Sequence, residues 1–280
     1  MTNLTWIFLS IFAGLSDIGF NYYSRHLLKD KETAVSMTWW FSSARMLIFL
    51  PLFLKDIRLA TDLNNHIFLL IIGAVNTLNV YLFMLMHVNT HLSVSTILVR
   101  LRIIFVPLLS ALILGEILVF KDYIGIIIIF IAVAIVSAPQ KQILDNKYLY
   151  ALIFSFTTSV ITILMKILSN LTPTHTIIFA MSLPTVVLLP FMTKKPKDLV
   201  VNLTKNLYLK AIVTLFSILL VYLLVWAFEY GGPVAKVNAI FQSMAIFSVP
   251  LGIIFLKESD SLREKILGSI LAILGIALLV

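Results

Sequence analysis

The residues best suited to chemistry in this chain are polar side chains that stand inside long apolar segments. Arg100 and Arg102 lie near the middle of one such segment, and Asp17 lies near the middle of another, with Asn21 one turn further on. A charge at mid-membrane costs about 2.5–3.5 kcal/mol on insertion scales, so such a residue faces a cavity or a partner. An arginine can bind a carboxylate or phosphate through its planar guanidinium. These residues therefore predict a binding site for a small polar molecule with an anionic group.

The two arginines are expected to have different roles. Arg100 and Arg102 are separated by about 200° around a helix, so they cannot both point into one cavity. Ser93 and Thr96 share a polar stripe with Arg100, and we therefore expect Arg100 to face the cavity. Arg102 lies on another face, where it could brace a neighbouring helix or contact the substrate. For both arginines the alternative is a structural ion pair with an acid, or bonds to backbone carbonyls.

Asp17 has three interpretations: it could neutralise an arginine, bind an amine of the substrate, or carry a proton that couples transport. Asn21 lies one helical turn further on the same face and could contact the same molecule. A fixed ion pair of Asp17 with Arg45 or Arg102 is the alternative. Arg45 in the run 36–54 is a further candidate substrate contact, although its long side chain could reach the membrane surface instead.

Amide and aromatic side chains in the second half of the chain complete the predicted site. Asn238 and Gln242 lie four residues apart in an apolar segment and share a helix face. Their amides could hydrogen-bond a polar substrate, or could join two helices at about 1 kcal/mol for each bond. Trp226 could stack on a substrate, although an aromatic residue at that depth is typical of the interfacial belt of a membrane protein.

The chain lacks the patterns of the common catalytic and metal sites. It has no cysteine, so thiolate chemistry and thiolate metal sites are excluded. Its five histidines are scattered along the sequence, which does not favour a histidine metal site. No zinc-protease, serine-hydrolase or phosphate-loop pattern is present. We therefore expect no catalytic residue, no metal site and no cofactor. Any transport must then run on a gradient and not on ATP.

Composition assigns the chain to the integral membrane proteins. Hydrophobic residues make up 60% of it and charged residues 12%, whereas a soluble domain has about 25% charged residues. The net charge of +8 comes from Lys and Arg between the apolar runs, which indicates membrane-flanking charge and not a nucleic-acid surface. An apolar run of about 20 residues crosses a bilayer as a helix, because unpaired backbone groups cannot face lipid. The runs of this kind are 4–24, 36–54, 66–87, 92–114, 119–138, 148–168, 174–193, 207–229, 234–255 and 262–280.

One pattern occurs twice in the chain. An apolar run with a late proline, Pro107 or Pro250, leads to a charged corner that contains Glu116 or Glu258. A second apolar run then opens at Gly125 or Gly268, after the same interval in both copies. A proline removes a helical hydrogen bond and kinks its helix. In a carrier both kinks could act as hinges, whereas the alternative is a kinked helix in a static bundle. We expect the corner glutamate to be structural.

The repeat predicts an all-α integral membrane fold of ten transmembrane helices, arranged as two inverted five-helix repeats. The first repeat is 1–138, the linker is 139–147, and the second repeat is 148–280. Because each repeat has an odd number of spans, the second is inverted relative to the first. We expect the runs 92–114 and 234–255 to face one another across a central cavity.

Three groups of residues resemble the signatures of a known family: Ala227–Ala235 with Pro250 and Lys257-Glu258; Pro107, Gly115-Glu116 and Gly125; and Gly19-Phe20-Asn21 with Arg25. The family is the EamA-type branch of the drug/metabolite transporter superfamily. The resemblance implies a ten-helix carrier of small organic metabolites in a bacterial inner membrane, with a central cavity open to one side at a time. The chain departs from the family at Arg100 and Arg102, where the family has small or apolar residues.

Location and partners follow from these inferences. We expect a multi-pass protein of the inner (plasma) membrane of a bacterium, as either a monomer or a homodimer. Its partners are a small-molecule substrate and membrane lipids, and nucleic acid is not among them. Lys and Arg are concentrated on one side of the predicted spans and place both termini outside the cytoplasm. The family resemblance places both termini inside it.

The sequence thus predicts a secondary transporter. It would move a small polar organic metabolite, such as an amino acid or a related anion or zwitterion, by alternating access through the cavity between the repeats. Two other classes stay open. An intramembrane enzyme acting on a lipid or isoprenoid would need acids, His or Ser clustered near one interface. A scaffold subunit without transport would not need charges at mid-depth.

Overall fold

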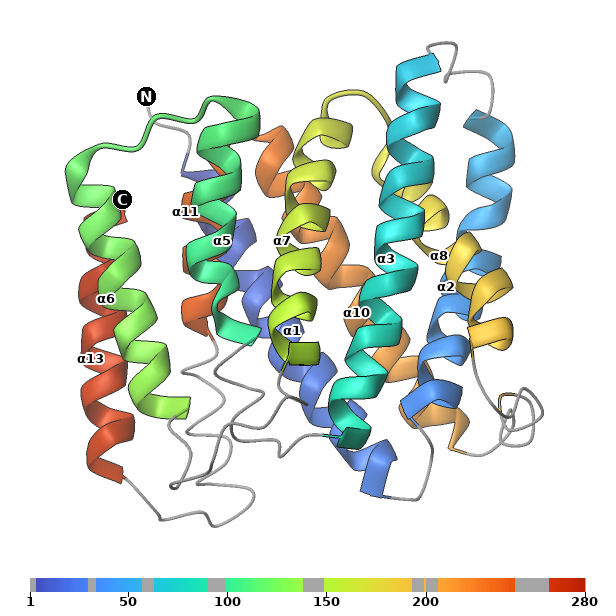
Figure 1. Ribbon diagram of the computed structural model, residues 1–280, viewed down its shortest axis with the longest axis horizontal. Helices are drawn as coiled ribbons and strands as arrows, with labels where there is room; N and C mark the ends of the chain where they lie inside the picture. Colours follow the sequence, from blue (N-terminus) through green and yellow to red (C-terminus); the bar gives the residue numbers. More distant parts are fainter. Residues whose placement is uncertain are drawn as a thin grey trace.

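The computed structural model is a bundle of helices that run side by side between its two ends (Figure 1). Every regular element within the described residues is a helix. The structure describes residues 4–29, 34–56, 63–89, 99–137, 149–192, 199, 206–244 and 262–279. In chain order the helices are α1 (Thr5–Lys29), α2 (Ala34–Asp56), α3 (Leu63–Asn89), α5 (Arg102–Leu109), the π-helix η1 (Ser110–Leu114), α6 (Phe120–Ser137), α7 (Leu149–Ser169), α8 (Thr174–Met192), α10 (Leu207–Glu229), α11 (Val234–Ser243) and α13 (Leu262–Leu279).

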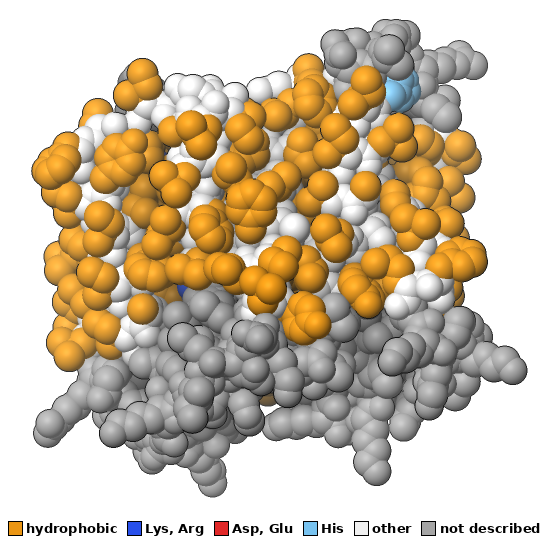
Figure 2. All heavy atoms as spheres, viewed as in Figure 1, with side chains coloured by type: hydrophobic (Ala, Val, Ile, Leu, Met, Phe, Trp, Pro, Cys, Tyr) orange, Lys and Arg blue, Asp and Glu red, His pale blue; other side chains and the backbone are white. Residues whose placement is uncertain are grey.

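The outer surface of the bundle is apolar, as expected of a multi-pass membrane protein. Figure 2 shows hydrophobic side chains over most of the described part of one face. Leu112 and Phe191 are 81% and 84% exposed. Contact of such side chains with water is unfavourable, whereas contact with lipid tails is favourable. Two shorter apolar helices, Arg102–Leu114 and Leu267–Leu279, accompany the long ones. Within the described residues, five helices are long and apolar enough to cross a membrane: Ser36–Lys55, Asn65–Phe83, Leu149–Ser169, Thr174–Met192 and Leu207–Glu229.

The helix contacts repeat when the two halves of the chain are exchanged. α1 packs along α10 and against α11, and its counterpart α7 packs along α3 and against α5. Three further contacts join a helix to its own counterpart: α2 to α8, α5 to α11, and α6 to α13. The largest contacts in the described part of the chain therefore run between the halves.

Asn76 and Asn79 of α3 form hydrogen bonds with helices of the second half. The Nδ2 atom of Asn76 donates to the backbone oxygen of Met181 in α8 at 2.8 Å. The Nδ2 atom of Asn79 donates to Oγ1 of Thr157 and of Thr158 in α7, at 2.8 Å in both cases. Interhelical bonds of this kind contribute about 0.6 kcal/mol each in membranes. Both amides therefore stabilise helix contacts.

Glycines allow α6 and α13 to approach very closely at one edge of the bundle, on the left of Figure 1. A Cβ atom added to Gly275 of α13 would lie 2.5 Å from Cγ1 of Ile129 in α6. It would also lie 2.9 Å from the backbone oxygen of Gly125 in α6. The two helices thus meet backbone to backbone, as membrane helices do where small residues line the contact. Ala272 of α13 is buried as well.

The chain leaves α5 through an irregular segment. Pro107 is buried inside α5, and η1 follows directly at Ser110–Leu114. Gly115 ends η1 with a φ of 65°, in the left-handed region that favours glycine. Of the two predicted hinges, Pro107 lies beside this segment and Pro250 lies outside the described residues. The hinge role stays a prediction for both.

Candidate functional site

Arg100 and Gln242, from corresponding regions of the two halves, meet inside the bundle. The Nη1 atom of Arg100 donates a hydrogen bond of 2.6 Å to Oε1 of Gln242. Gln242 lies in α11 and is 0% exposed, and Arg100 is half-buried just before α5. These two predicted contact residues therefore touch directly. The sequence predicted that the runs carrying them face one another across a cavity.

Arg102 also reaches α11. Its guanidinium carbon lies 5.0 Å from the ring centroid of Phe241. The Nδ2 atom of Asn238 donates to the backbone oxygen of Arg102 at 3.2 Å. An ideal helix would direct Arg100 and Arg102 about 200° apart, but both side chains contact α11, Arg100 at Gln242 and Arg102 at Phe241. Arg102 thus packs on a neighbouring helix, and its contact with a substrate stays a prediction.

Asp17 adds a negative charge to this region from α1. Asp17 is half-buried. The negative charge of Asp17 attracts the guanidinium of Arg102, whereas the positive charge of Arg100 repels that guanidinium. The Nδ2 atom of Asn21 donates to the backbone oxygen of Asp17 at 2.8 Å, so the Asn21 amide is turned toward its own helix. The structure therefore brings together most of the predicted site. We call Asp17, Arg100, Arg102, Asn238 and Gln242 the central cluster.

Arg45 is buried and lies apart from the central cluster. It is in the middle of α2, only 5% exposed, with its guanidinium carbon 5.0 Å from the ring centroid of Phe41. Phe41 contacts Phe20 of α1, and Phe49 contacts Tyr222 of α10, with ring centroids 5.8 Å apart in each pair. The helix face that carries Arg45 therefore points inward. Arg45 is buried against two other helices and does not extend to the membrane surface, and its contact with a substrate stays a prediction.

Trp226 is not part of the central cluster. It lies in the last turn of α10, is 42% exposed, and packs edge to face on Tyr222 with centroids 5.6 Å apart. An exposed aromatic ring near the end of a spanning helix is typical of the interfacial belt. Its role as a substrate contact has no support from this position.

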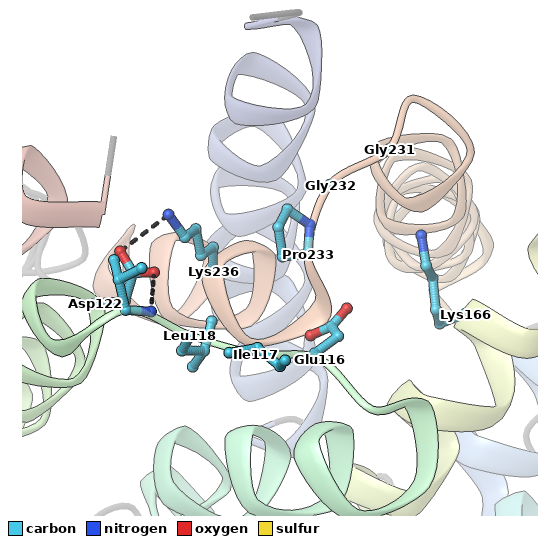
Figure 3. A pocket seen from close by; sticks show the side chains of 10 residues that line it. Glu116, Ile117, Leu118, Asp122, Lys166, Gly231, Gly232, Pro233 and Lys236 are labelled. Carbon is cyan, nitrogen blue, oxygen red and sulfur yellow. Dashed lines mark hydrogen bonds and ion pairs between the residues drawn. The ribbon is translucent and has the colours of Figure 1, made fainter.

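A second polar cluster joins the halves at the end of the bundle where η1 leads to α6 (Figure 3). Oε1 of Glu116 accepts a hydrogen bond of 2.8 Å from the backbone N–H of Val234. Oε2 accepts one of 3.4 Å from the backbone N–H of Ala235. Both N–H groups belong to the first turn of α11, so a carboxylate of the first half caps a helix of the second.

Asp122 and Lys236 form an ion pair across the same boundary, with Oδ1 and Nζ 3.0 Å apart. Lys236 also donates to the backbone oxygen of Leu279 at 3.0 Å. The Nζ atom of Lys166 donates to the backbone oxygen of Phe228 at 2.9 Å, beside an open pocket of about 410 Å³. We call Glu116, Asp122, Lys166 and Lys236 the corner cluster.

The sequence did not predict the Asp122–Lys236 pair or the position of Phe241 beneath Arg102. Both members of the pair stand at the start of apolar runs, but their partnership depends on how the halves dock, which no local pattern encodes. Phe241 looks like any core aromatic residue, and only its place beside Gln242 could have indicated it. Within the described ranges, no three His, Cys, Asp or Glu residues lie close enough to hold a metal ion.

Comparison with known proteins agrees with this arrangement in two halves. The sequence profile of the EamA-like transporter family matches residues 4–138 and, a second time, residues 146–280. A protein of Archaeoglobus fulgidus named as an uncharacterized transporter is 27% identical over 176 residues. This match spans 63% of the present chain and 62% of the archaeal protein.

A crystal structure of another protein has a similar fold. The TM-score is 0.68 at 13% sequence identity, and the match covers 96% of this chain and 95% of the other. Identity this low supports the fold alone. The two profile matches cover nearly the whole sequence, and the outer surface of the bundle is that of a multi-pass membrane protein. The chain belongs to the EamA-like transporter family.

Proposed function

We propose that the protein is a secondary transporter for a small polar organic metabolite with an anionic group, such as an amino acid or a related anion or zwitterion. It acts in the plasma (inner) membrane. The observation that carries the proposal is the contact of Arg100 with Gln242, which places an arginine where the two halves meet. Substrates of carriers with internal repeats bind at such an interface near the middle of the membrane. A scaffold would gain nothing from a charge there, because burying it is costly.

Alternating access between two inverted five-helix halves is supported by the helix packing. The contact of α1 with α10 is repeated by α7 with α3, and α5 meets its own counterpart α11. A twofold axis in the membrane plane produces this pattern when each half has an odd number of spans. We propose ten spans in all. Five of them, within the described residues, are helices long and apolar enough to cross a membrane.

The corner cluster provides contacts that one step of such a cycle must break. Glu116 and Asp122 belong to the first half, and their partners Val234 and Lys236 belong to the second. Opening the bundle at this end separates the two corners and exposes these groups to water. These contacts support the proposal that the corner cluster holds the carrier closed at this end.

Arg100→Lys is expected to weaken substrate binding by about 1–3 kcal/mol, because lysine keeps the charge but loses the planar fork. Arg100→Ala should abolish transport while the protein still inserts. The measurement is uptake of a panel of radiolabelled amino acids and carboxylates into proteoliposomes. Arg45→Lys is the matched control, since Arg45 is a buried arginine outside the central cluster. A normal rate and affinity in Arg100→Ala would make Arg100 a structural residue and remove the support for this site.

Asp17 is the proposed acid for coupling to protons, since an arginine stays protonated at physiological pH and cannot release a proton. The charges that act on one another here are those of Asp17, Arg100 and Arg102. Asp17→Asn is expected to flatten the dependence of uptake on external pH while uptake itself continues. The measurement is the initial uptake rate across a series of external pH values, with Asn21→Ala as the control. A pH profile equal to that of the unmodified protein would exclude Asp17 from coupling.

A further inference from the structure

The orientation of the Gln242 amide is fixed by chemistry. An arginine side chain has only donors, so the group of Gln242 that faces Arg100 must be the oxygen. The Nη1–Oε1 distance of 2.6 Å is that of a charge-assisted hydrogen bond. The NH₂ end of the amide is therefore directed away from Arg100, and exchanging its two ends would set donor against donor.

That NH₂ end has no acceptor in the described part of the chain. Gln242 is 0% exposed, and its Nε2 atom is buried without a hydrogen-bond partner. A buried donor left unsatisfied costs about 1–3 kcal/mol. Native proteins leave few such groups, so each one calls for an explanation.

The unsatisfied groups nearby are donors as well. The Nε atom of Arg102 is buried without a hydrogen-bond partner among the described residues. Its guanidinium packs on Phe241, which precedes Gln242 in α11. The Asn238 amide, one turn earlier, is already occupied by the backbone oxygen of Arg102. Apart from the Asp17 carboxylate of α1, whose charge attracts that of Arg102, the buried groups without a hydrogen-bond partner at this crossing of α5 and α11 are donors in the described part of the chain.

We infer that the missing acceptor is a carboxylate or phosphate group of the transported molecule, held by Nε2 of Gln242 and by Arg102. An ionised oxyacid offers several acceptor sites and no donor, which matches this set of groups. A buried water is a poorer match, because it brings two donors that would need acceptors of their own. This inference rests on the proposed transport function and adds which residues recognise the anion.

Gln242 is then the residue that determines specificity for an anion. Arg100 is in addition a positioning residue, because its bond to Oε1 fixes which end of the Gln242 amide faces the ligand. A glutamate at this position would have the same shape and the same bond to Arg100. It would replace the NH₂ donor by a second carboxylate oxygen, which repels an anion.

The test compares Gln242→Glu with Gln242→Met. The unmodified protein and both variants are purified in nanodiscs and titrated calorimetrically with L-glutamate, succinate and inorganic phosphate. Uptake of the same probes into proteoliposomes is measured in parallel. We expect the unmodified protein to bind at least one probe. Gln242→Met, which removes the donor without adding charge, should weaken that probe about 10-fold. Gln242→Glu should weaken it at least about 100-fold, with thermal stability equal or higher because the new carboxylate pairs with Arg100.

Two results would overturn the inference, and they differ in what they say about transport. If the unmodified protein transports an anionic probe and Gln242→Glu binds it equally well, the assignment of Gln242 fails while the transport function stands. If the unmodified protein binds and transports none of the anionic probes but carries a cation or a neutral solute, the anion site and the proposed substrate class both fail. Equal weakening by Gln242→Glu and Gln242→Met would also contradict the inference, because the sign of the charge would then not matter.

Discussion

Gly275→Leu is expected to separate α6 from α13 and to leave little folded protein. A Cβ atom at this position already meets Ile129 of α6 and the backbone oxygen of Gly125, and leucine adds three more carbon atoms there. Overpacking costs about 1–3 kcal/mol where side chains can give way, and more where they cannot. Here the backbone of the facing helix must move, so we expect a loss of at least about 3 kcal/mol.

The measurement is thermal unfolding in detergent together with the yield of monodisperse protein. Gly275→Ala should fall between the unmodified protein and Gly275→Leu. Ile273→Leu is the control, because Ile273 is in the same helix but 64% exposed on its outer face. An unfolding temperature of Gly275→Leu equal to that of the control would show that the two helices do not pack this closely.

If the proposed alternating access holds, Glu116→Ala is expected to favour the state that is open at the end of the bundle where the corner cluster lies. The substitution removes two charge-assisted acceptors from the first turn of α11, and a hydrogen bond to a charged group contributes about 1.5–3 kcal/mol. The loss falls on the state in which the two corners touch, so the population of the state open at this end should rise. Transport should then become slower, because the carrier closes less readily at this end.

Opening can be followed by labelling an introduced cysteine, since the chain has none of its own. Ala239 of α11 is 0% exposed, so Ala239→Cys should react slowly with a maleimide and faster when Glu116→Ala is added. Glu229→Ala is the matched control, because Glu229 accepts a bond from Thr174 at 3.3 Å and both residues belong to the second half. Equal labelling rates with and without Glu116 would mean that the corner cluster does not control opening.

The helices could be predicted from the sequence because each is encoded locally. The run 207–229 has the bounds of α10, Leu207–Glu229, and the run 174–193 ends one residue beyond α8, Thr174–Met192. Long apolar runs in lipid have no alternative to a helix. The π-helix Ser110–Leu114 could not be predicted, because no composition marks the place where a helix widens by one residue per turn. The apolar run 92–114 is continuous and therefore predicts one uninterrupted helix.

The central cluster was partly predictable and the corner cluster was not. Arg100 and Gln242 stood out because polar residues are rare inside apolar runs, and the repeat indicated that their helices face one another. Glu116 stood out as well, but its bond to Val234 depends on how two distant corners meet. The burial of Arg45 was not predicted for a similar reason, since the position of a residue in an apolar run does not show what packs on it.

The contacts of α2 with α8, α5 with α11 and α6 with α13 have a consequence for symmetry. When like elements meet, the interface is isologous, as between two copies of one subunit, and a residue at the axis meets its own copy. When Pro107 is aligned with Pro250, Arg100 falls next to the counterpart of Gln242. In a dimer of identical halves this position would pair arginine with arginine, and the like charges would repel. Fusing the halves in one chain allows an arginine on one side and an amide on the other, so an asymmetric ligand can be bound in one orientation at a pseudosymmetric centre.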